Sequence, residues 1–135
     1  MSLISEAFRA ACKELDYSPW PNGARFIRAG GRLGGTILEN TDIEALEKSG
    51  AELLFTDPAT VGALLHYVIE TLPDTDEVSI VVQPKVGRRP SVRINRGGYS
   101  FYHGDTIAEA LVGVLQGEAA RVKRDNDTKK KKESR

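Results

Sequence analysis

Apolar residues recur with helical spacing in two stretches of the first 72 residues. The first stretch comprises Ile4, Phe8, Ala11, Cys12 and Leu15. Spacings of three and four place these side chains on one stripe, which predicts a helix over about 3–15. The second is more regular and comprises Val61, Leu64, Leu65, Val68, Ile69 and Leu72. Asp57 followed by Pro58 is a typical helix start, and Pro73 ends this second predicted helix.

The pattern then changes to alternation, which predicts strands over 77–83, 91–95 and 99–103. Gly97-Gly98 favours a two-residue loop between the last two strands, at either Arg96-Gly97 or Gly97-Gly98. That loop would place Tyr99, Phe101 and His103 on the core face with Val92 and Ile94. Arg93, Ser100 and Tyr102 would then face outward. Thr106 and Glu109 form a capping-box pattern that begins a last helix over about 105–116.

The region between the first two helices predicts a small additional unit. Residues 16–23 form an irregular connector around Trp20. Residues 24–29 and 32–38 flank Gly30-Gly31 and predict a hairpin. Thr41 with Glu44 predicts a short helix that ends at Gly50.

These elements define an α+β fold, an antiparallel β-meander with packed helices plus an N-terminal helix, hairpin and short helix. Residues 1–56 are the N-terminal unit, which lies in the same compact domain or forms a subdomain of it. Residues 57–120 are the helix, three strands and helix. Residues 121–135 hold 8 basic and 3 acidic residues and little to bury, so a tail that is disordered or frays from the last helix is predicted.

Charge is unevenly divided although the net charge is +0. Residues 1–77 hold 13 acidic and 6 basic residues, and residues 78–135 hold 6 acidic and 13 basic. No acidic residue occurs from Val78 to Gly104. This window predicts an anion-facing or partner-binding surface, in which guanidinium groups bind phosphate or carboxylate oxygens and an exposed Tyr stacks or fills a pocket. Its candidate residues are Lys85, Arg88, Arg89, Arg93, Arg96 and Tyr102.

Enzymatic and metal chemistry find little support in the sequence. Cys12 lies in an apolar stripe and is interpreted as core, His66 as a surface residue and His103 as structural. The acidic cluster at 74–77 lacks calcium-loop spacing, and the glycines at 30–35 match no phosphate-binding motif. We therefore predict no catalytic residue, no cofactor and no metal. One cysteine and the lack of a long apolar stretch predict a soluble cytoplasmic protein.

The strand at 91–95, the strand at 99–103 and the segment GDTIAEALVGVL resemble the end of the α/β/α sandwich domain of small phage-encoded accessory proteins. The resemblance spans about residues 57–118 and does not include the N-terminal unit. It implies a phage or prophage origin and a non-enzymatic role, such as antagonism of a host defence or nucleic-acid enzyme. It assigns no site residues.

Three functions are compatible with these patterns. The first is a binding or inhibitor protein that engages a protein or ribonucleoprotein partner through the basic hairpin at 85–96. The second is a protein that sequesters an anionic, nucleotide-like ligand, and the third is an enzyme using His103 with Asp105. Direct binding to nucleic acid through the lysines at 129–132 is a further alternative. The two opposite charge patches would also suit a homodimer.

Overall fold

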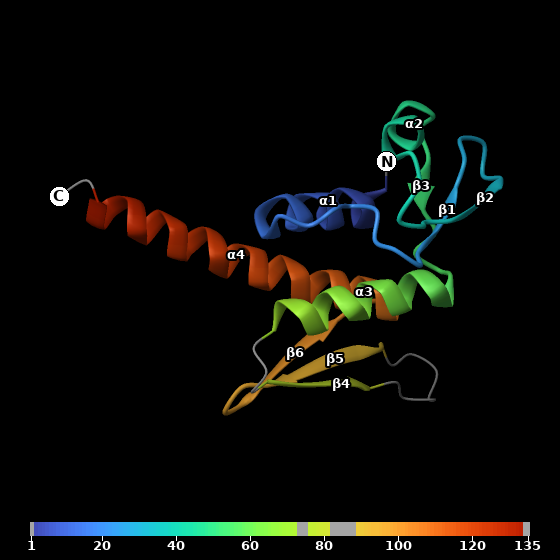
Figure 1. Cartoon of the computed structure of the whole chain (residues 1–135). Helices are drawn as coiled ribbons and strands as arrows, with labels where there is room; N and C mark the ends of the chain where they lie inside the picture. Colours follow the sequence, from blue (N-terminus) through green and yellow to red (C-terminus); the bar gives the residue numbers. More distant parts are fainter. Residues whose placement is uncertain (1, 73–75, 82–88, 134–135) are drawn as a thin grey trace.

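The computed structural model describes residues 2–72, 76–81 and 89–133, and it confirms the α+β class (Figure 1). Two small antiparallel sheets of three strands each accompany the four helices found among these residues. In chain order the elements are α1 (Leu3–Leu15), β1 (Arg25–Ile27), β2 (Leu33–Thr36), α2 (Ile43–Lys48), β3 (Glu52–Leu53), α3 (Pro58–Thr71), β4 (Glu77–Val81), β5 (Ser91–Asn95), β6 (Tyr99–His103) and α4 (Ile107–Glu133).

The first sheet belongs to the N-terminal unit and has the order β2-β1-β3. The predicted hairpin is confirmed, since β1 pairs with β2, with a register shift between Phe26 and Ile27. The two-residue strand β3, which the sequence pattern is too short to reveal, pairs with the other edge of β1. The short helix α2 is confirmed, although its N-cap is Asp42. Thr41 is not the cap, because its hydroxyl accepts a hydrogen bond from the Leu38 amide at 2.8 Å.

Helix α3 begins as predicted, with Asp57 capping the Ala59 amide at 2.9 Å and Pro58 in the first turn. Its buried side is narrower than the apolar stripe. Leu64 and Val68 are fully buried, whereas Ile69 is 55% exposed. Thr60 is also fully buried, and its hydroxyl accepts a hydrogen bond from the Arg25 amide at 3.0 Å. This bond connects α3 to the first sheet.

The second sheet has the order β4-β5-β6, which confirms the antiparallel meander. Asn95 pairs with Tyr99, so the turn contains three residues, 96–98, and not the two that were predicted. Gly97 occupies the left-handed region at φ 73°, which glycine adopts without steric cost. Since strand side chains alternate, this one-residue difference reverses the face of every side chain in β6 relative to β5. The predicted faces of Tyr99, Phe101, Tyr102 and His103 were therefore wrong.

Helix α4 lies at the centre of the fold, in contact with α1, α3, β5 and β6 (Figure 1). A helix covered on several sides is apolar around most of its circumference, and the first half of α4 follows this rule. Its buried residues are Ala108, Ala110, Leu111, Val112, Val114, Leu115, Glu118 and Ala119. One buried cluster extends from Phe8 and Cys12 on α1 through Leu64 on α3 to Val92 on β5. Residues 1–56 and 57–120 thus contribute to the same core.

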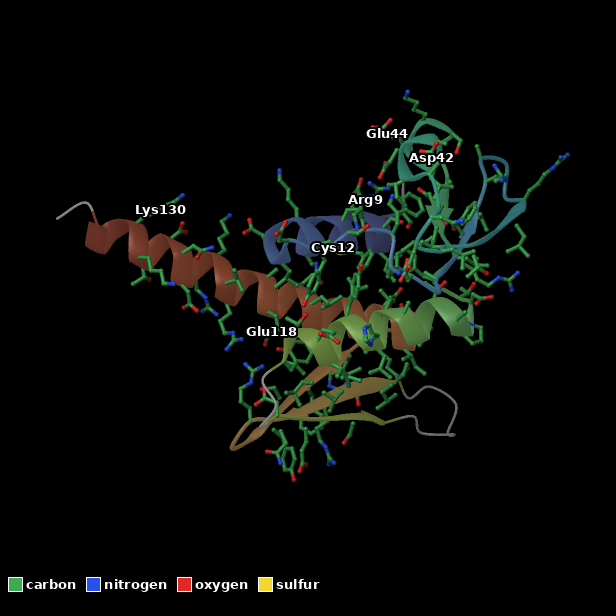
Figure 2. The ribbon with its side chains drawn as sticks, in the orientation of Figure 1. Arg9, Cys12, Asp42, Glu44, Glu118 and Lys130 are labelled. Atoms are coloured by element: carbon green, nitrogen blue, oxygen red, sulfur yellow. The ribbon has the colours of Figure 1, made fainter. Side chains whose placement is uncertain are left out.

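The segment from Arg121 continues α4 as far as Glu133, where the sequence predicts disorder or fraying. Every side chain from Lys123 to Lys130 is exposed, as expected of a segment with little to bury. Figure 2 shows Lys130 on the part of α4 that extends beyond α1. In the part of the chain that the structure describes, no helix is both long and apolar enough to span a membrane.

Candidate binding surface

The face of the second sheet turned away from α4 carries a row of aromatic side chains. Tyr99, Phe101 and His103 alternate along β6 and point to this side, because their neighbour Tyr102 points to α4. Tyr99 is 61% exposed and Phe101 is 54% exposed, and the His103 side chain is exposed as well. We call the surface formed by these three residues and Arg93 the aromatic face.

The three rings form a regular ladder. The ring centroids of Tyr99 and Phe101 are 6.4 Å apart, and those of Phe101 and His103 are 6.3 Å apart with nearly parallel planes. A repeat of this size follows from the rise of about 6.7 Å over two strand residues. The spacing of the rings therefore matches the spacing of alternate residues along β6.

Arg93 lies beside this ladder on the central strand. It pairs across β5 and β6 with Phe101, and its guanidinium carbon is 4.8 Å from the centre of the Tyr99 ring. This distance is typical of a cation–π contact. Among the residues described, Arg93 makes no ion pair, so its guanidinium hydrogens are available to a ligand. The sequence prediction that Arg93 faces outward is confirmed.

Polar side chains lie beside the rings on the same face. Ser79 on β4 lies opposite Arg93, and Glu77 lies opposite Asn95, which in turn pairs with Tyr99. The rings contact one another along the edge strand β6, and these polar groups lie to one side of them, on β5 and β4. Such a surface suits a partner that offers flat rings and hydrogen-bonding groups together.

Arg96, another predicted anion-binding residue, is held within the fold. It contacts Asp76 through Nε at 2.6 Å and Glu118 through an Nη at 2.7 Å, and both carboxylates are almost fully buried. The hydrogen bond to Glu118 raises the pKa of Arg96, against the opposite effect of partial burial. The assignment of Arg96 to an external anion was wrong, because its guanidinium neutralises two buried carboxylates of the same chain. Leaving these carboxylates without a counter-charge would be costly.

Glu118, which Figure 2 labels, joins this network to a second arginine on α4. An Nη of Arg121 lies 2.6 Å from its Oε2, an ion pair that lacks hydrogen-bond geometry. Arg96 stands at the turn between β5 and β6, whereas Asp76 precedes β4. The network therefore fastens the turn end of the sheet to the middle of α4.

Tyr102 is not the exposed stacking residue that the sequence predicted. It pairs with Val92 on the inner face of the sheet and packs against α4. A Cβ placed on Gly117 would lie 3.0 Å from the Tyr102 hydroxyl, which shows how closely the ring approaches the helix. The small residues at 113 and 117 leave the space that this ring occupies.

Arg89, a further candidate, precedes β5 at the end of the sheet opposite the turn at 96–98. Arg89 is 69% exposed and forms an ion pair with Asp105 at 3.2 Å, a contact that contributes little in water. It can exchange this partner for an external anion. Lys85 and Arg88 fall outside the described residues.

Neither imidazole belongs to a catalytic arrangement among the described residues. His66 lies 3.6 Å from Glu70 on the surface of α3, and His103 belongs to the aromatic face. No cluster of potential metal ligands occurs in the described ranges. The cavity of about 430 Å³ between the connector at 18–22 and α3 is lined by Trp20, Ile37 and Tyr67, and by no residue of the aromatic face.

Comparisons with protein-family models, with curated proteins and with solved structures each find no match for this chain. Geometry alone therefore identifies the candidate surface. Sequence reasoning located the correct strands but missed Tyr99 and Phe101, which it assigned to the core. The signal that could have found them is the length of the turn. A loop of three residues, 96–98, places these two rings on the exposed face.

Proposed function

We propose that this chain is a non-enzymatic binding protein that engages a nucleic-acid-handling or host-defence complex through its aromatic face. The observation behind the proposal is the exposure of Tyr99 and Phe101 beside Arg93. Large exposed rings contribute little to folding, and tyrosine and arginine are enriched among residues that dominate binding energies. The choice of partner class rests on the phage-protein resemblance of residues 57–118.

The position of the candidate arginines changes the form of this proposal. Arg96 stabilises the fold, so the binding residues are Arg93 and the three rings, with Arg89 near the edge. Among the described residues, the proposed interface therefore lies on β5 and β6. We favour this function over ligand sequestration, because the aromatic face is an open sheet surface and ligand sites are usually concave.

The proposal is tested by affinity capture from a lysate of the native host with variants of the immobilised full-length chain. Replacing Tyr99 and Phe101 together by Ser should abolish capture of any partner retained by the wild-type chain. Leu33→Ser with Leu38→Ser is the matched control, because these side chains are 55% and 58% exposed on the N-terminal unit. The control pair should retain the partner.

Circular dichroism melting of each variant separates lost binding from lost folding. Both double variants should melt within a few degrees of the wild-type chain, because exposed substitutions change the stability of a fold by about 0.5 kcal/mol or less. Undiminished capture by the variant without Tyr99 and Phe101 would refute the aromatic face as the interface. A loss of capture in the control alone would move the interface to the N-terminal unit.

A further inference from the structure

We infer that the aromatic face binds unpaired nucleotides, with the bases of a single strand stacking on Tyr99, Phe101 and His103. This inference rests on the proposed function, because it assumes that the face is the binding surface. It adds the chemical class of the ligand. Aromatic side chains presented by a β-sheet or groove are a general means of holding single strands, since every base offers a flat face.

The ring spacing suits an extended strand. Successive rings lie 6.4 and 6.3 Å apart, about twice the rise of about 3.4 Å between stacked bases in a duplex strand. Bases that remain stacked on one another cannot each meet a ring at this spacing, whereas bases separated along an extended backbone can. The ladder therefore favours unpaired nucleotides over a double helix.

The charges and polar groups around the rings also suit a nucleic acid. Arg93 stands beside Tyr99 and makes no ion pair among the described residues, and Arg89 makes only the exposed contact with Asp105. An arginine can stack on a base or donate to a phosphate. On the same face, Asn95 on β5 and Ser79 on β4 lie to one side of the rings and offer hydrogen bonds to base edges, and Glu77 adds one negative charge beside Asn95. The guanidinium group and the polar neighbours thus suit phosphates and base edges, and the ring spacing carries the choice of an unpaired strand.

The direction of the ladder brings a bound strand toward a second positive region. Tyr99 ends the ladder next to the turn at 96–98, which Arg96 fastens to Glu118 on α4. Beyond Glu118 the exposed part of α4 carries Lys123, Arg124, Lys129 and Lys130, together with Asp125 and Asp127. Its excess of positive charge can attract phosphates that pass the turn.

Fluorescence anisotropy with the full-length chain tests this inference directly. The probes are fluorescein-labelled oligothymidylate and oligouridylate of about 12 nucleotides, within the site sizes of single-strand-binding proteins, and a mixed-sequence duplex of equal length. The wild-type chain should bind the single strands more tightly than the duplex. Replacing Tyr99 or Phe101 by Ala should weaken single-strand binding about 5- to 150-fold, which corresponds to one lost stacking contact of about 1–3 kcal/mol.

Three controls make the result specific. Leu33→Ser with Leu38→Ser should leave the affinity unchanged. Arg93→Gln should weaken binding and lower the dependence on salt by about one released counterion if the guanidinium binds a phosphate. A chain that ends at Val122 should keep the contribution of Tyr99 and Phe101 while losing affinity in a salt-dependent manner.

Two outcomes would overturn the inference and leave the proposed function intact. The first is the absence of oligonucleotide binding while lysate capture still requires Tyr99 and Phe101, which would identify a protein partner. The second is oligonucleotide binding that ring substitutions do not affect, which would assign the binding to the basic end of α4. Failure of the proposed function is distinguishable, because it appears as capture that persists without the two rings.

Discussion

The two faces of the β4–β6 sheet are built from the same strands, but one face is buried and the other is exposed. On the inner face, Val92 and Ile94 are buried at 0% and 2% exposure beneath α4. On the outer face, Tyr99 and Phe101 remain more than half exposed. Burial of apolar area provides the free energy of folding, so the inner side chains account for the sheet's stability. The outer rings contribute little to the stability of the sheet. Folding therefore does not require these residues to be aromatic, and binding can determine their identity.

The largest effect on stability is expected at the ionic network that closes one end of this sheet. Arg96→Ala would leave Asp76 and Glu118, with side chains only 3% and 4% exposed, without their shared guanidinium. Removing one partner of a buried ion pair costs about 3–5 kcal/mol. Urea unfolding should show a decrease of about that size for Arg96→Ala.

Arg89→Ala is the control for this measurement, because its ion pair with Asp105 is exposed at both ends. It should cost less than about 1 kcal/mol. Equal losses in the two variants would mean that the fold does not depend on Arg96 more than on an ordinary surface arginine.

The next largest effect on the free energy of unfolding is expected when one residue is substituted on each face of the sheet. Ile94→Ala should lower the free energy of unfolding by about 2–5 kcal/mol, because it removes buried methyl groups and leaves a cavity. Phe101→Ala, on the other face of the neighbouring strand, should change it by about 0.5 kcal/mol or less. Paired urea titrations measure both values. A large loss in Phe101→Ala would show that the outer rings are structural and would weaken the case for a binding surface.

Cys12 offers an independent reporter of the difference in stability expected between Ile94→Ala and Phe101→Ala. Burial raises the pKa of its thiol to about 12, so at pH 8 it is protonated and shielded from thiol reagents. Labelling should then follow opening of the core. A loss of about 3 kcal/mol in Ile94→Ala should accelerate labelling on the order of a hundredfold, whereas Phe101→Ala should leave the rate nearly unchanged. Rapid labelling of the wild-type chain would contradict the burial of this thiol.

The smallest effect on stability is expected at the far end of α4. A chain that ends at Val122 loses only exposed side chains among those described from Lys123 to Lys130. Its free energy of unfolding should change by about 0.5 kcal/mol or less in calorimetric or urea experiments. A destabilisation above about 1 kcal/mol would show that this segment packs against the fold.

Much of the architecture could be predicted from the sequence because its signals are local. The stripe ending at Leu15, the Asp57-Pro58 start and the alternation at 91–95 each depend on neighbouring residues. Strand β3 was missed because two residues cannot show a period. The capping residue of α2 was misassigned because Thr41 and Asp42 are both suitable caps.

The candidate site was harder to predict because it depends on the number of residues in one turn and on contacts between residues far apart in the sequence. A turn of three residues, where two were expected, moved Tyr99 and Phe101 outward and Tyr102 inward. The partners of Arg96 lie 20 and 22 residues away, beyond any local pattern. Composition correctly indicated a basic second half, but it could not separate the arginine that stabilises the fold from the one that remains available.

The central position of α4 also constrains how this chain is made. Every other described element precedes α4 in the sequence, yet α1, α3 and two strands of the second sheet pack against it. During synthesis, these earlier segments emerge from the ribosome with their apolar sides uncovered, since the helix that covers them is translated after them. The part of the core that α4 covers can therefore close only after the segment from residue 107 has been synthesised.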